Sequence, residues 1–270
     1  MIFTDEMAER YARHFVLKEI GASGQEKLLQ SKVLVIGAGG LGSAALMYLA
    51  SAGVGTIGIC DFDKVSLSNL QRQVIHGTGE VGEDKTNSAK KFIEQINPDV
   101  NVIIHNERMT VDNIQGVISP YDFILDCTDR FETKFLINDA CVLSKKPYSH
   151  AGVVRFEGQI MTYVPDKGPC LRCLLGGVPP EKDTAYCSTV GVLGAAVGVM
   201  GSLQATEAVK YILGIGDLLV GRVLRFDGLK MKFASFDFPH AATDCAVCGK
   251  NATINSLSDN RAEYELTSCI

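Results

Sequence analysis

Short runs of apolar residues alternate along the first half of the chain with stretches whose apolar positions are three or four residues apart. The runs predict buried strands and the wider spacing predicts helices. The expected strands are 33–36, 56–61, 100–105 and 122–125, and the expected helices are 4–19, one that begins near Ser43, 85–96 and 111–118. This alternation predicts an α/β fold whose first half is Rossmann-like, with a mostly parallel sheet.

Beyond residue 148 the pattern changes to extended stretches without long helices between them. Residues 149–164 predict strands with bends at Gly152 and Gly158. Residues 220–226 and 231–236 flank D-G-L-K and predict a hairpin. The second half of the sheet is therefore expected to be antiparallel.

Residues 184–206 contain no charged side chain, yet they do not predict a membrane span. The basic and aromatic anchors of a spanning helix are missing from the flanks. Small residues recur instead every three to four positions, as in a helix packed closely against others. They are Gly191, Gly194, Ala195, Gly198 and Gly201. We expect this segment to form core and a dimer interface.

The most informative motif is V-L-V-I-G-A-G-G-L-G-S at 33–43, a strand that ends in a glycine turn and opens a helix. Four glycines let the backbone turn tightly and approach a phosphate at the helix N-terminus. They are Gly37, Gly39, Gly40 and Gly42. Asp61 lies nineteen residues after Gly42, where a carboxylate accepts hydrogen bonds from ribose hydroxyls. The sequence therefore predicts a nucleotide site, although nicotinamide-dependent oxidoreductases share this fingerprint.

The stretch D-F-D-K-V-S-L-S-N-L-Q-R-Q at 61–73 narrows the choice of nucleotide. Asp63 belongs to its acidic start, and Asn69, Arg72 and Gln73 lie in the loop directly beyond. A guanidinium presents a planar fork of donors that suits phosphate oxygens. A nicotinamide-dependent dehydrogenase has no use for that group here. A nucleoside triphosphate is therefore the predicted ligand.

At these motifs the chain resembles the ThiF/MoeB-type adenylyltransferases of sulfur carrier proteins, in the family that includes ubiquitin-activating enzymes. The resemblance extends from R-Y-A-R at 10–13 to C-A-V-C at 245–248. It implies an enzyme that uses ATP and Mg²⁺ to adenylylate the C-terminal Gly-Gly carboxylate of a small ubiquitin-like sulfur carrier protein (ThiS- or MoaD-like), with release of pyrophosphate. Thiamine, molybdenum cofactor, cysteine and tRNA sulfur pathways use such enzymes, and the sequence does not distinguish among them.

The resemblance also implies roles for residues outside the glycine turn. Arg13 matches an arginine that reaches the ATP of the partner subunit in homodimeric members, Lys85 matches a phosphate-binding lysine, and Asp129 matches the Mg²⁺-binding acid. An exposed charged helix is the plain alternative for Arg13, and a helix N-cap is the alternative for Asp129. Asp126, in the same L-D-C-T-D motif, is expected to be structural or supporting, and His150 is given no role.

Two C-x-x-C pairs predict a structural metal site. Cys170 and Cys173 form the first pair, and Cys245 and Cys248 form the second, 71 residues further on. Four such thiolates suit a tetrahedral Zn²⁺ ion that contributes folding energy and leaves no open position for chemistry. A redox dithiol is the alternative, but neither pair has the expected helix start.

Cys187 ends a Gly/Pro/charge segment that begins at Leu175 and predicts a mobile loop. In the resembling family a cysteine here takes the activated carboxylate as a covalent adduct, or stands there without that role. A free thiol titrates near pH 8.5, and the sequence shows no positive charge that would lower its pKa. Both roles stay open for Cys187.

Composition excludes some functions. With 46% hydrophobic residues and a net charge of −5, the 270-residue chain fits a well-cored domain and shows no electrostatic footprint for nucleic acid. The N-terminus is acidic and has no apolar segment of a signal peptide, so we expect a cytoplasmic protein. Nine cysteines in that compartment favour metal or catalysis over disulfides.

We expect an adenylation domain at 1–249 and a tail at 250–270. The domain would comprise N-terminal helices at 4–30, a nucleotide-binding half at 31–150 and a carrier-facing half with the zinc site at 151–249. Because the tail has no sulfurtransferase-like domain, we expect any sulfurtransferase or cysteine desulfurase to be a separate protein. A non-catalytic scaffold that binds a ubiquitin-like partner is a further alternative, whose mark would be a missing Arg or Asp.

Overall fold

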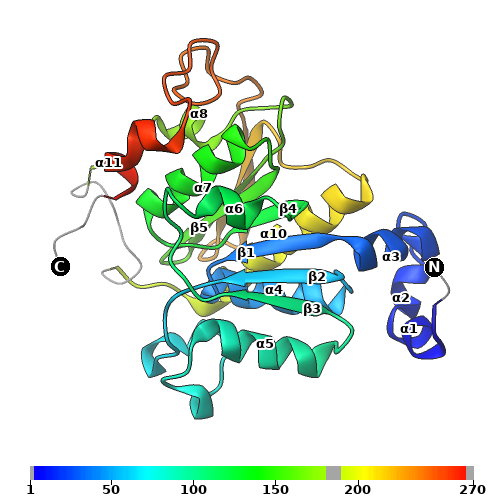
Figure 1. Cartoon of the computed structure of the whole chain (residues 1–270). Coiled ribbons are helices and arrows are strands. Elements are labelled where there is room, and N and C mark those ends of the chain that lie inside the picture. The colour runs from blue at the N-terminus through cyan, green and yellow to red at the C-terminus, as the bar shows by residue number, and fades with distance from the viewer. Residues whose placement is uncertain (1–2, 181–189, 266–270) are drawn as a thin grey trace.

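A single eight-stranded sheet organises the molecule, and the computed structural model describes residues 3–180 and 190–265 of it. The strand order is β3-β2-β1-β4-β5-β6-β7-β8 (Figure 1). The strands are β1 (Lys32–Ile36), β2 (Thr56–Cys60), β3 (Asn101–His105), β4 (Phe123–Asp126), β5 (Tyr148–Val154), β6 (Glu157–Tyr163), β7 (Arg222–Asp227) and β8 (Lys232–Asp237). Pairing is parallel from β3 to β5 and antiparallel from β5 to β8. The predicted change from a parallel to an antiparallel half is confirmed.

Helices cover both faces of the parallel half (Figure 1). The helices of the described residues are α1 (Asp5–Arg10), α2 (Ala12–Phe15), α3 (Gly21–Gln30), α4 (Gly40–Ser51), α5 (Lys85–Ile96), α6 (Ile114–Ile118), α7 (Phe131–Leu143), α8 (Leu171–Leu175), α10 (Gly194–Leu213) and α11 (Arg261–Tyr264). Short 3₁₀ turns are η1 (Leu67–Asn69), η2 (Thr78–Glu80) and η4 (Leu257–Asn260). One hydrophobic core lies under α4, α5 and α10, and a second lies under α6 and α7.

Strand β1 shows why the central runs are apolar at every position. Val33 and Val35 point into the core with α4 and α10, whereas Leu34 and Ile36 point into the core with α7. Because successive side chains of a strand face opposite sides, a strand covered on both faces needs a continuous apolar run. Helix coverage of both faces therefore explains the absence of polar alternation.

Helix α10 packs closely against α4, as the spacing of its small residues predicted. A Cβ on Gly201 would lie 2.3 Å from the carbonyl oxygen of Leu41, and a Cβ on Gly194 would lie 2.4 Å from that of Gln71. Only glycine permits these approaches. Among the described residues, no helix has the length and apolar character required to cross a membrane.

Two local expectations differ from the structure. The predicted N-terminal helix is broken at Tyr11, which leaves helical geometry and buries its ring, so that its hydroxyl accepts a hydrogen bond from Asn97. The bends expected at Gly152 and Gly158 are absent, and the chain reverses at Arg155 and Phe156, between β5 and β6. A Cβ on Gly158 would meet Met200 at 2.5 Å, so that glycine serves packing.

Candidate functional site

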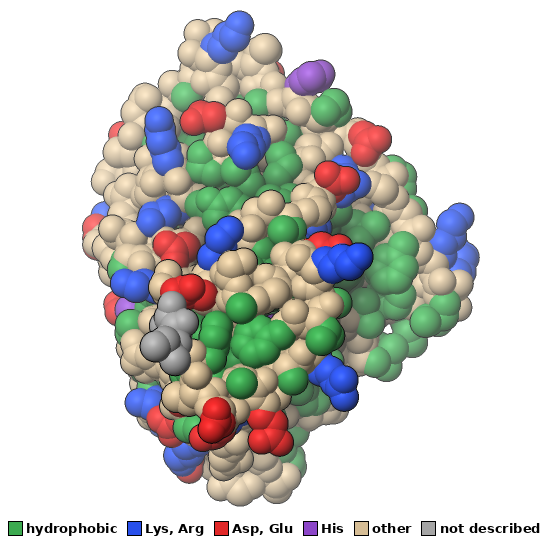
Figure 2. All heavy atoms as spheres, turned by 90° about the vertical axis from the view of Figure 1, so that its right-hand side faces the viewer, with side chains coloured by type: hydrophobic (Ala, Val, Ile, Leu, Met, Phe, Trp, Pro, Cys, Tyr) green, Lys and Arg blue, Asp and Glu red, His purple; other side chains and the backbone are tan. Residues whose placement is uncertain are grey.

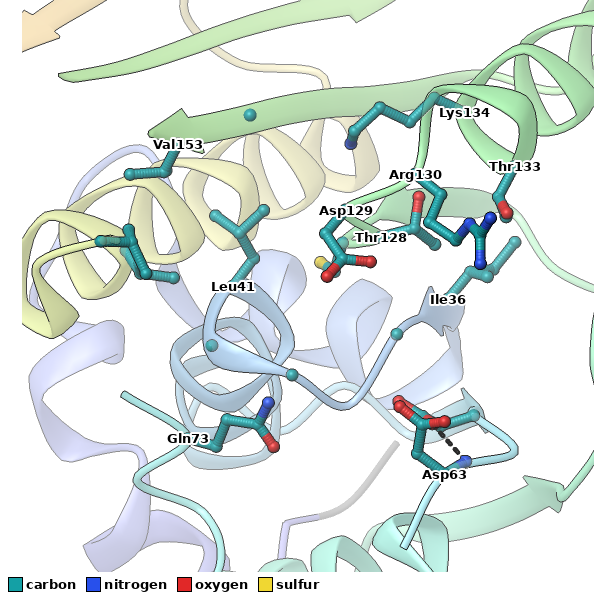
Figure 3. A pocket seen from close by; sticks show the side chains of 18 of the residues that line it. Ile36, Leu41, Asp63, Gln73, Thr128, Asp129, Arg130, Thr133, Lys134 and Val153 are labelled. Atoms are coloured by element: carbon teal, nitrogen blue, oxygen red, sulfur yellow. Dashed lines mark hydrogen bonds between the residues drawn. The ribbon is translucent and has the colours of Figure 1, made fainter. Parts of the chain in front are cut away.

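A cavity of about 640 Å³ opens at the edge where β1, β2 and β4 end. The chain runs outward from β1 to β2 and β3 and then crosses to β4 on the other side of β1, and such a switch point is where open α/β sheets bind ligands. The lining comes from the glycine turn, the segment after β2, the start of α7 and the adjoining strands β5 and β6 (Figure 3). Much of the predicted site therefore converges on one cavity.

The glycine turn is held so tightly that two of its glycines cannot carry a side chain. Gly37 has a φ of +101°, and a Cβ there would lie 2.7 Å from the Cys127 carbonyl oxygen in the loop after β4. A Cβ on Gly42 would lie 1.9 Å from the Gly37 carbonyl oxygen. Glycine therefore lets the start of α4 approach the end of β1, with Gly39 and Gly40 left on the cavity wall.

Asp61 stands beside this turn and already helps to shape it. Its Oδ2 accepts a hydrogen bond from Ala38 N at 2.8 Å, and its Oδ1 accepts one from Asp63 N at 2.8 Å. Burial raises the pKa of Asp61 above its ordinary value, although Lys85 and the two N–H groups act against that rise. Each carboxylate oxygen accepts two hydrogen bonds, so capacity for a ribose hydroxyl remains.

Cations and Gln73 line the same cavity. Lys85 is the first residue of α5, is 5% exposed and forms an ion pair with Asp63 at 2.9 Å. Arg72 is half-buried and donates from Nη1 to the Ser68 carbonyl oxygen at 3.2 Å. Gln73 is 5% exposed, and its Oε1 has no hydrogen-bond partner among the described residues. These groups offer positive charge and an unpaired polar atom to a ligand.

Asp129 points into the cavity from the loop between β4 and α7 (Figure 3). It is exposed, and its carboxylate makes no hydrogen bond or ion pair with another described residue. The N-cap of α7 is Arg130, and no side chain caps that helix by a hydrogen bond. The capping alternative for Asp129 is therefore wrong, and the carboxylate is available to a ligand.

Asp126, three residues earlier, has a different environment. It is fully buried and lies 3.2 Å from Lys134 Nζ and 2.8 Å from His150 Nδ1. Burial alone would raise the pKa of Asp126, but Lys134 and the hydrogen bond from His150 outweigh it and hold that pKa below the ordinary range. Asp126 and His150 thus lie behind the cavity wall, in agreement with a supporting role.

Some lining residues were not singled out from the sequence, and some predicted ones lie elsewhere. Arg130, Thr133 and Lys134 line the cavity from the start of α7 (Figure 3). Their position directly after the acid at the end of a parallel strand was the available signal. Asn69 is half-buried but does not line the cavity, and Arg13 is exposed on α2, away from the cavity of its own chain. Cys187 lies outside the described residues.

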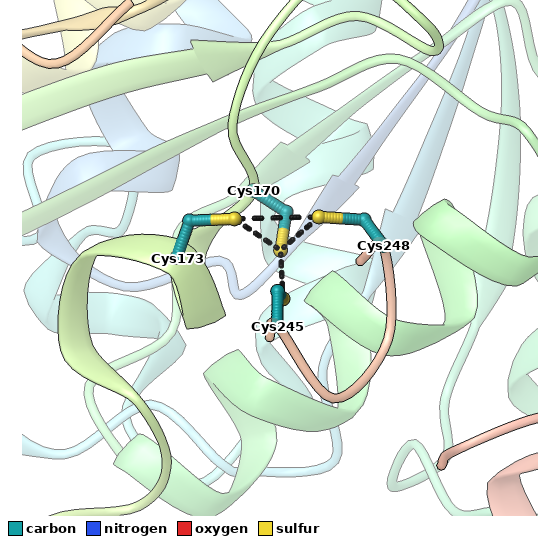
Figure 4. Close-up of side chains that lie close together, drawn as sticks. All are labelled: Cys170, Cys173, Cys245 and Cys248. Carbon is teal, nitrogen blue, oxygen red and sulfur yellow. Dashed lines mark hydrogen bonds between the residues drawn. The ribbon is translucent and has the colours of Figure 1, made fainter. Parts of the chain in front are cut away.

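The two C-x-x-C pairs meet in space (Figure 4). All four sulfur atoms lie within 4.8 Å of one another, with 3.7 Å between Cys170 and Cys245 and 3.3 Å between Cys173 and Cys248. Zn–S bonds of about 2.3 Å in a tetrahedron place sulfurs about 3.8 Å apart. The expectation that neither pair starts a helix is wrong for the first pair, since Cys170 is the N-cap of α8. A dithiol formed by one pair nevertheless does not account for the convergence of all four, and the cluster is compatible with a zinc ion.

Ion pairs of Arg172 connect this cluster to α7 and to the C-terminal segment. Arg172 lies between the first two cysteines and donates to Asp139 of α7 from Nε at 2.9 Å and from Nη2 at 2.7 Å. Its Nη2 also donates to Glu263 at 2.7 Å, and the Tyr264 hydroxyl donates to Asp139. We call residues 170–178 and 242–265, together with Asp139 of α7, the cysteine lobe.

Comparison with known proteins agrees with this geometry. The ThiF family pattern matches residues 11–247. The chain is 44% identical to the adenylyltransferase and sulfurtransferase MOCS3 of Aedes aegypti, over 93% of this chain and 57% of that protein, so it spans little more than half the length of that relative. It is 43% identical to the SAMP-activating enzyme E1 of Haloferax volcanii, over 93% of this chain and 92% of that enzyme.

Solved structures of E. coli MccB share the fold. MccB with MccA-N7isoASN has a TM-score of 0.78 and 25% identity, over 90% of this chain and 74% of that one. MccB with ATP has a TM-score of 0.76 and 25% identity, over 89% and 73% of the two chains. Fold, site and sequence therefore agree that this chain belongs to the ThiF family.

Proposed function

We propose that the chain adenylylates the C-terminal Gly-Gly carboxylate of a ubiquitin-like sulfur carrier protein with ATP. One observation carries the proposal: a glycine turn, the acid Asp61, the cations Arg72 and Lys85 and the acid Asp129 line one cavity. The names of the relatives, an adenylyltransferase and an activating enzyme, support the same reaction. Biosynthesis of thiamine or of the molybdenum cofactor is the expected setting.

In this reaction a carboxylate oxygen of the carrier attacks the α-phosphorus of ATP. The bond from that phosphorus to the bridging oxygen breaks, and pyrophosphate leaves with the electron pair. Arg72 and Lys85 neutralise the charge that builds on the leaving group, while Asp61 holds the ribose. Because no proton has to be removed from a carboxylate, catalysis rests on positioning and charge neutralisation.

The cavity has the donor set for a magnesium ion. Asp129 offers carboxylate oxygens that bond to no other residue the structure describes, and such oxygens are the hard ligands that Mg²⁺ prefers beside phosphates. A bound Mg²⁺ would neutralise triphosphate charge and orient the phosphates. The four cysteines, by contrast, would hold a structural Zn²⁺ ion and leave it no open position.

The carrier tail would enter along the strands that follow the parallel half. Gly152 and Gln159, on β5 and β6, line the same cavity as the glycine turn. Arg225 of β7 also lines it, in an exposed ion pair with Glu157 at 2.8 Å. Its charge suits the approach of an extended chain with a terminal carboxylate. Cys187 is a candidate for a covalent adduct after this step.

We propose a homodimer in which Arg13 reaches the ATP of the partner subunit. Within R-Y-A-R, Arg10 donates to the Ile96 carbonyl oxygen at 2.8 Å and Tyr11 is buried, whereas Arg13 is exposed. The face with the N-terminal helices carries apolar side chains among its charges (Figure 2). Val16 is 75% exposed and Tyr48 is 57% exposed. A separate sulfurtransferase or cysteine desulfurase would act on the adenylylated carrier.

Arg72→Ala tests the assignment. We expect carrier-dependent exchange of pyrophosphate into ATP to fall roughly 10²–10³-fold, as on removal of one donor to a charged transition state. Arg222→Ala is the matched control, since Arg222 bonds to two carbonyl oxygens outside the cavity. Exchange that survives Arg72→Ala refutes the assignment, and a chain that binds NADH but not ATP refutes the proposed function.

A further inference from the structure

His76 is a buried histidine that touches the glycine turn without lining the cavity. It is 7% exposed, and its Nε2 lies 2.9 Å from the carbonyl oxygen of Ala38, at the centre of the turn. A carbonyl oxygen only accepts, so Nε2 carries the proton and donates. Burial lowers the pKa of His76 below its ordinary value. No other described side chain donates to this carbonyl group.

The other ring nitrogen is fixed by a second set of contacts. Nδ1 lies 2.6 Å from Ser88 Oγ on α5, and Ser88 Oγ lies 2.8 Å from Glu80 Oε2. The same carboxylate oxygen accepts a hydrogen bond from Gly77 N at 2.7 Å. The orientation of the imidazole is therefore set by a side chain on the helix that begins with Lys85.

The bond to Ala38 has a consequence for the next residue. No described peptide bond is cis, and in a trans peptide the C=O and N–H groups point in opposite directions. When His76 holds the Ala38 carbonyl group, the Gly39 N–H points away from the imidazole. Gly39 lines the cavity, and its N–H makes no hydrogen bond to a described residue. It is thus a free donor for a phosphate oxygen.

Without this bond the peptide between Ala38 and Gly39 would have an alternative. Glycine populates positive φ as readily as negative φ, so Gly39 could absorb a peptide flip at little cost. A flipped peptide would present a carbonyl oxygen to the phosphates in place of an N–H. Asp61 holds the Ala38 N–H, which belongs to the preceding peptide, so among the described residues the peptide between Ala38 and Gly39 is held by His76 at its carbonyl oxygen.

We propose that His76 is a positioning residue that locks the peptide between Ala38 and Gly39 with its N–H toward the triphosphate. The inference rests on the proposed function for the identity of the nucleotide. Through its contact with Ser88, His76 connects the phosphate-binding turn to α5, the helix that begins with Lys85. Glu80 completes the chain of contacts.

Two variants separate the two ends of the imidazole. The amide nitrogen of Gln reaches the place of Nε2, so His76→Gln keeps the donor to Ala38 and loses the contact to Ser88. The amide of Asn reaches the place of Nδ1, so His76→Asn keeps the contact to Ser88 and loses the donor to Ala38. Both remove the ring, and thermal denaturation of each checks that they fold alike.

Isothermal titration calorimetry with ATP and with adenosine is the measurement. We expect His76→Asn to weaken ATP binding roughly tenfold or more, and His76→Gln less than about threefold, since one buried hydrogen bond distinguishes them. Adenosine should bind both variants as it binds the wild type, because it has no phosphate. Ser88→Ala should weaken ATP binding by an intermediate factor.

Two results overturn the role of His76: equal loss of ATP affinity in both variants, or equal loss for adenosine and ATP. The proposed function fails differently. If the wild-type chain binds ATP but catalyses no carrier-dependent exchange, the adenylylation proposal is refuted, while the comparison of the two variants still decides the role of His76.

Discussion

Two charged side chains at the cavity, Arg72 and Asp129, have no ionic partner among the described residues, whereas the charged side chains around Arg172 in the cysteine lobe pair with one another. Within residues 3–180 and 190–265, Asp129 makes no hydrogen bond or ion pair, and the Arg72 side chain bonds to one carbonyl oxygen, that of Ser68. In the lobe, the side chain of Arg172 is 3% exposed and contacts Asp139 and Glu263. Folding desolvates the lobe charges and compensates them internally, while Arg72 and Asp129 stay available to a ligand. The difference separates residues that hold the fold from residues that await a ligand.

Loss of one of the four clustered cysteines, the proposed zinc ligands, should have the largest effect on the fold. We expect Cys245→Ser to release the metal and to unfold the cysteine lobe, since structural zinc in small domains supplies roughly 10–16 kcal/mol of apparent binding free energy. Hydrogen exchange should rise in residues 170–178 and 242–265 and stay low in β1 and β2. Cys141→Ala, at a buried cysteine outside the cluster, is the control. A protected lobe after quantitative metal removal would contradict this role.

Arg172→Ala should have the next largest effect. It leaves Asp139 buried without its cation, and removal of one partner from a buried ion pair costs about 3–5 kcal/mol. Urea denaturation measures this change in the free energy of unfolding. Arg261→Ala is the matched control, because Arg261 pairs with Asp112 and Glu265 at the surface, where ion pairs contribute about 0–1 kcal/mol. Equal losses of unfolding free energy in the two variants would show that Arg172 contributes no more than a surface ion pair.

Asp129→Asn should have the smallest effect on stability and a large one on catalysis. The carboxylate has no partner in the described part of the chain, so we expect the free energy of unfolding to stay within about 0.5 kcal/mol of the wild-type value. Pyrophosphate exchange should fall roughly 10²–10³-fold if the acid holds a catalytic charge. Asp126→Asn, three residues earlier, should instead lose stability, because Lys134 is left beside a neutral amide in the core. If both variants lose the same stability and the same exchange activity, Asp129 and Asp126 do not have the different roles described above.

The sequence predicted the nucleotide half well because its determinants are local. A strand, a turn and the start of a helix follow one another within 33–43. Glycine is required at two positions there because neighbouring backbone atoms leave no room for a Cβ. The two C-x-x-C pairs were also recognisable, since each keeps a short fixed spacing. Such features leave a pattern that a single stretch of chain contains.

Contacts between distant segments left no such pattern. Glu263 meets Arg172 across 91 residues, and nothing in the polar C-terminal segment marks that pairing. His76 follows the Arg72 loop and drew no attention, because its contacts to Ala38 and Ser88 arise only when two segments pack. Conversely, Asn69 stands within a strong motif but does not line the cavity. Tertiary packing decided these positions.

One continuous sheet underlies both ends of the cavity. Strand β4 pairs with β1 on one side and with β5 on the other, so the turn that would hold ATP and the strands that would guide the carrier tail are two strand spacings apart. That span is about 9.6 Å and is fixed by backbone hydrogen bonds. In the proposed reaction, no movement of one domain toward another is then needed to bring the carrier carboxylate to the phosphate, because the pairing of the strands already sets the distance between them.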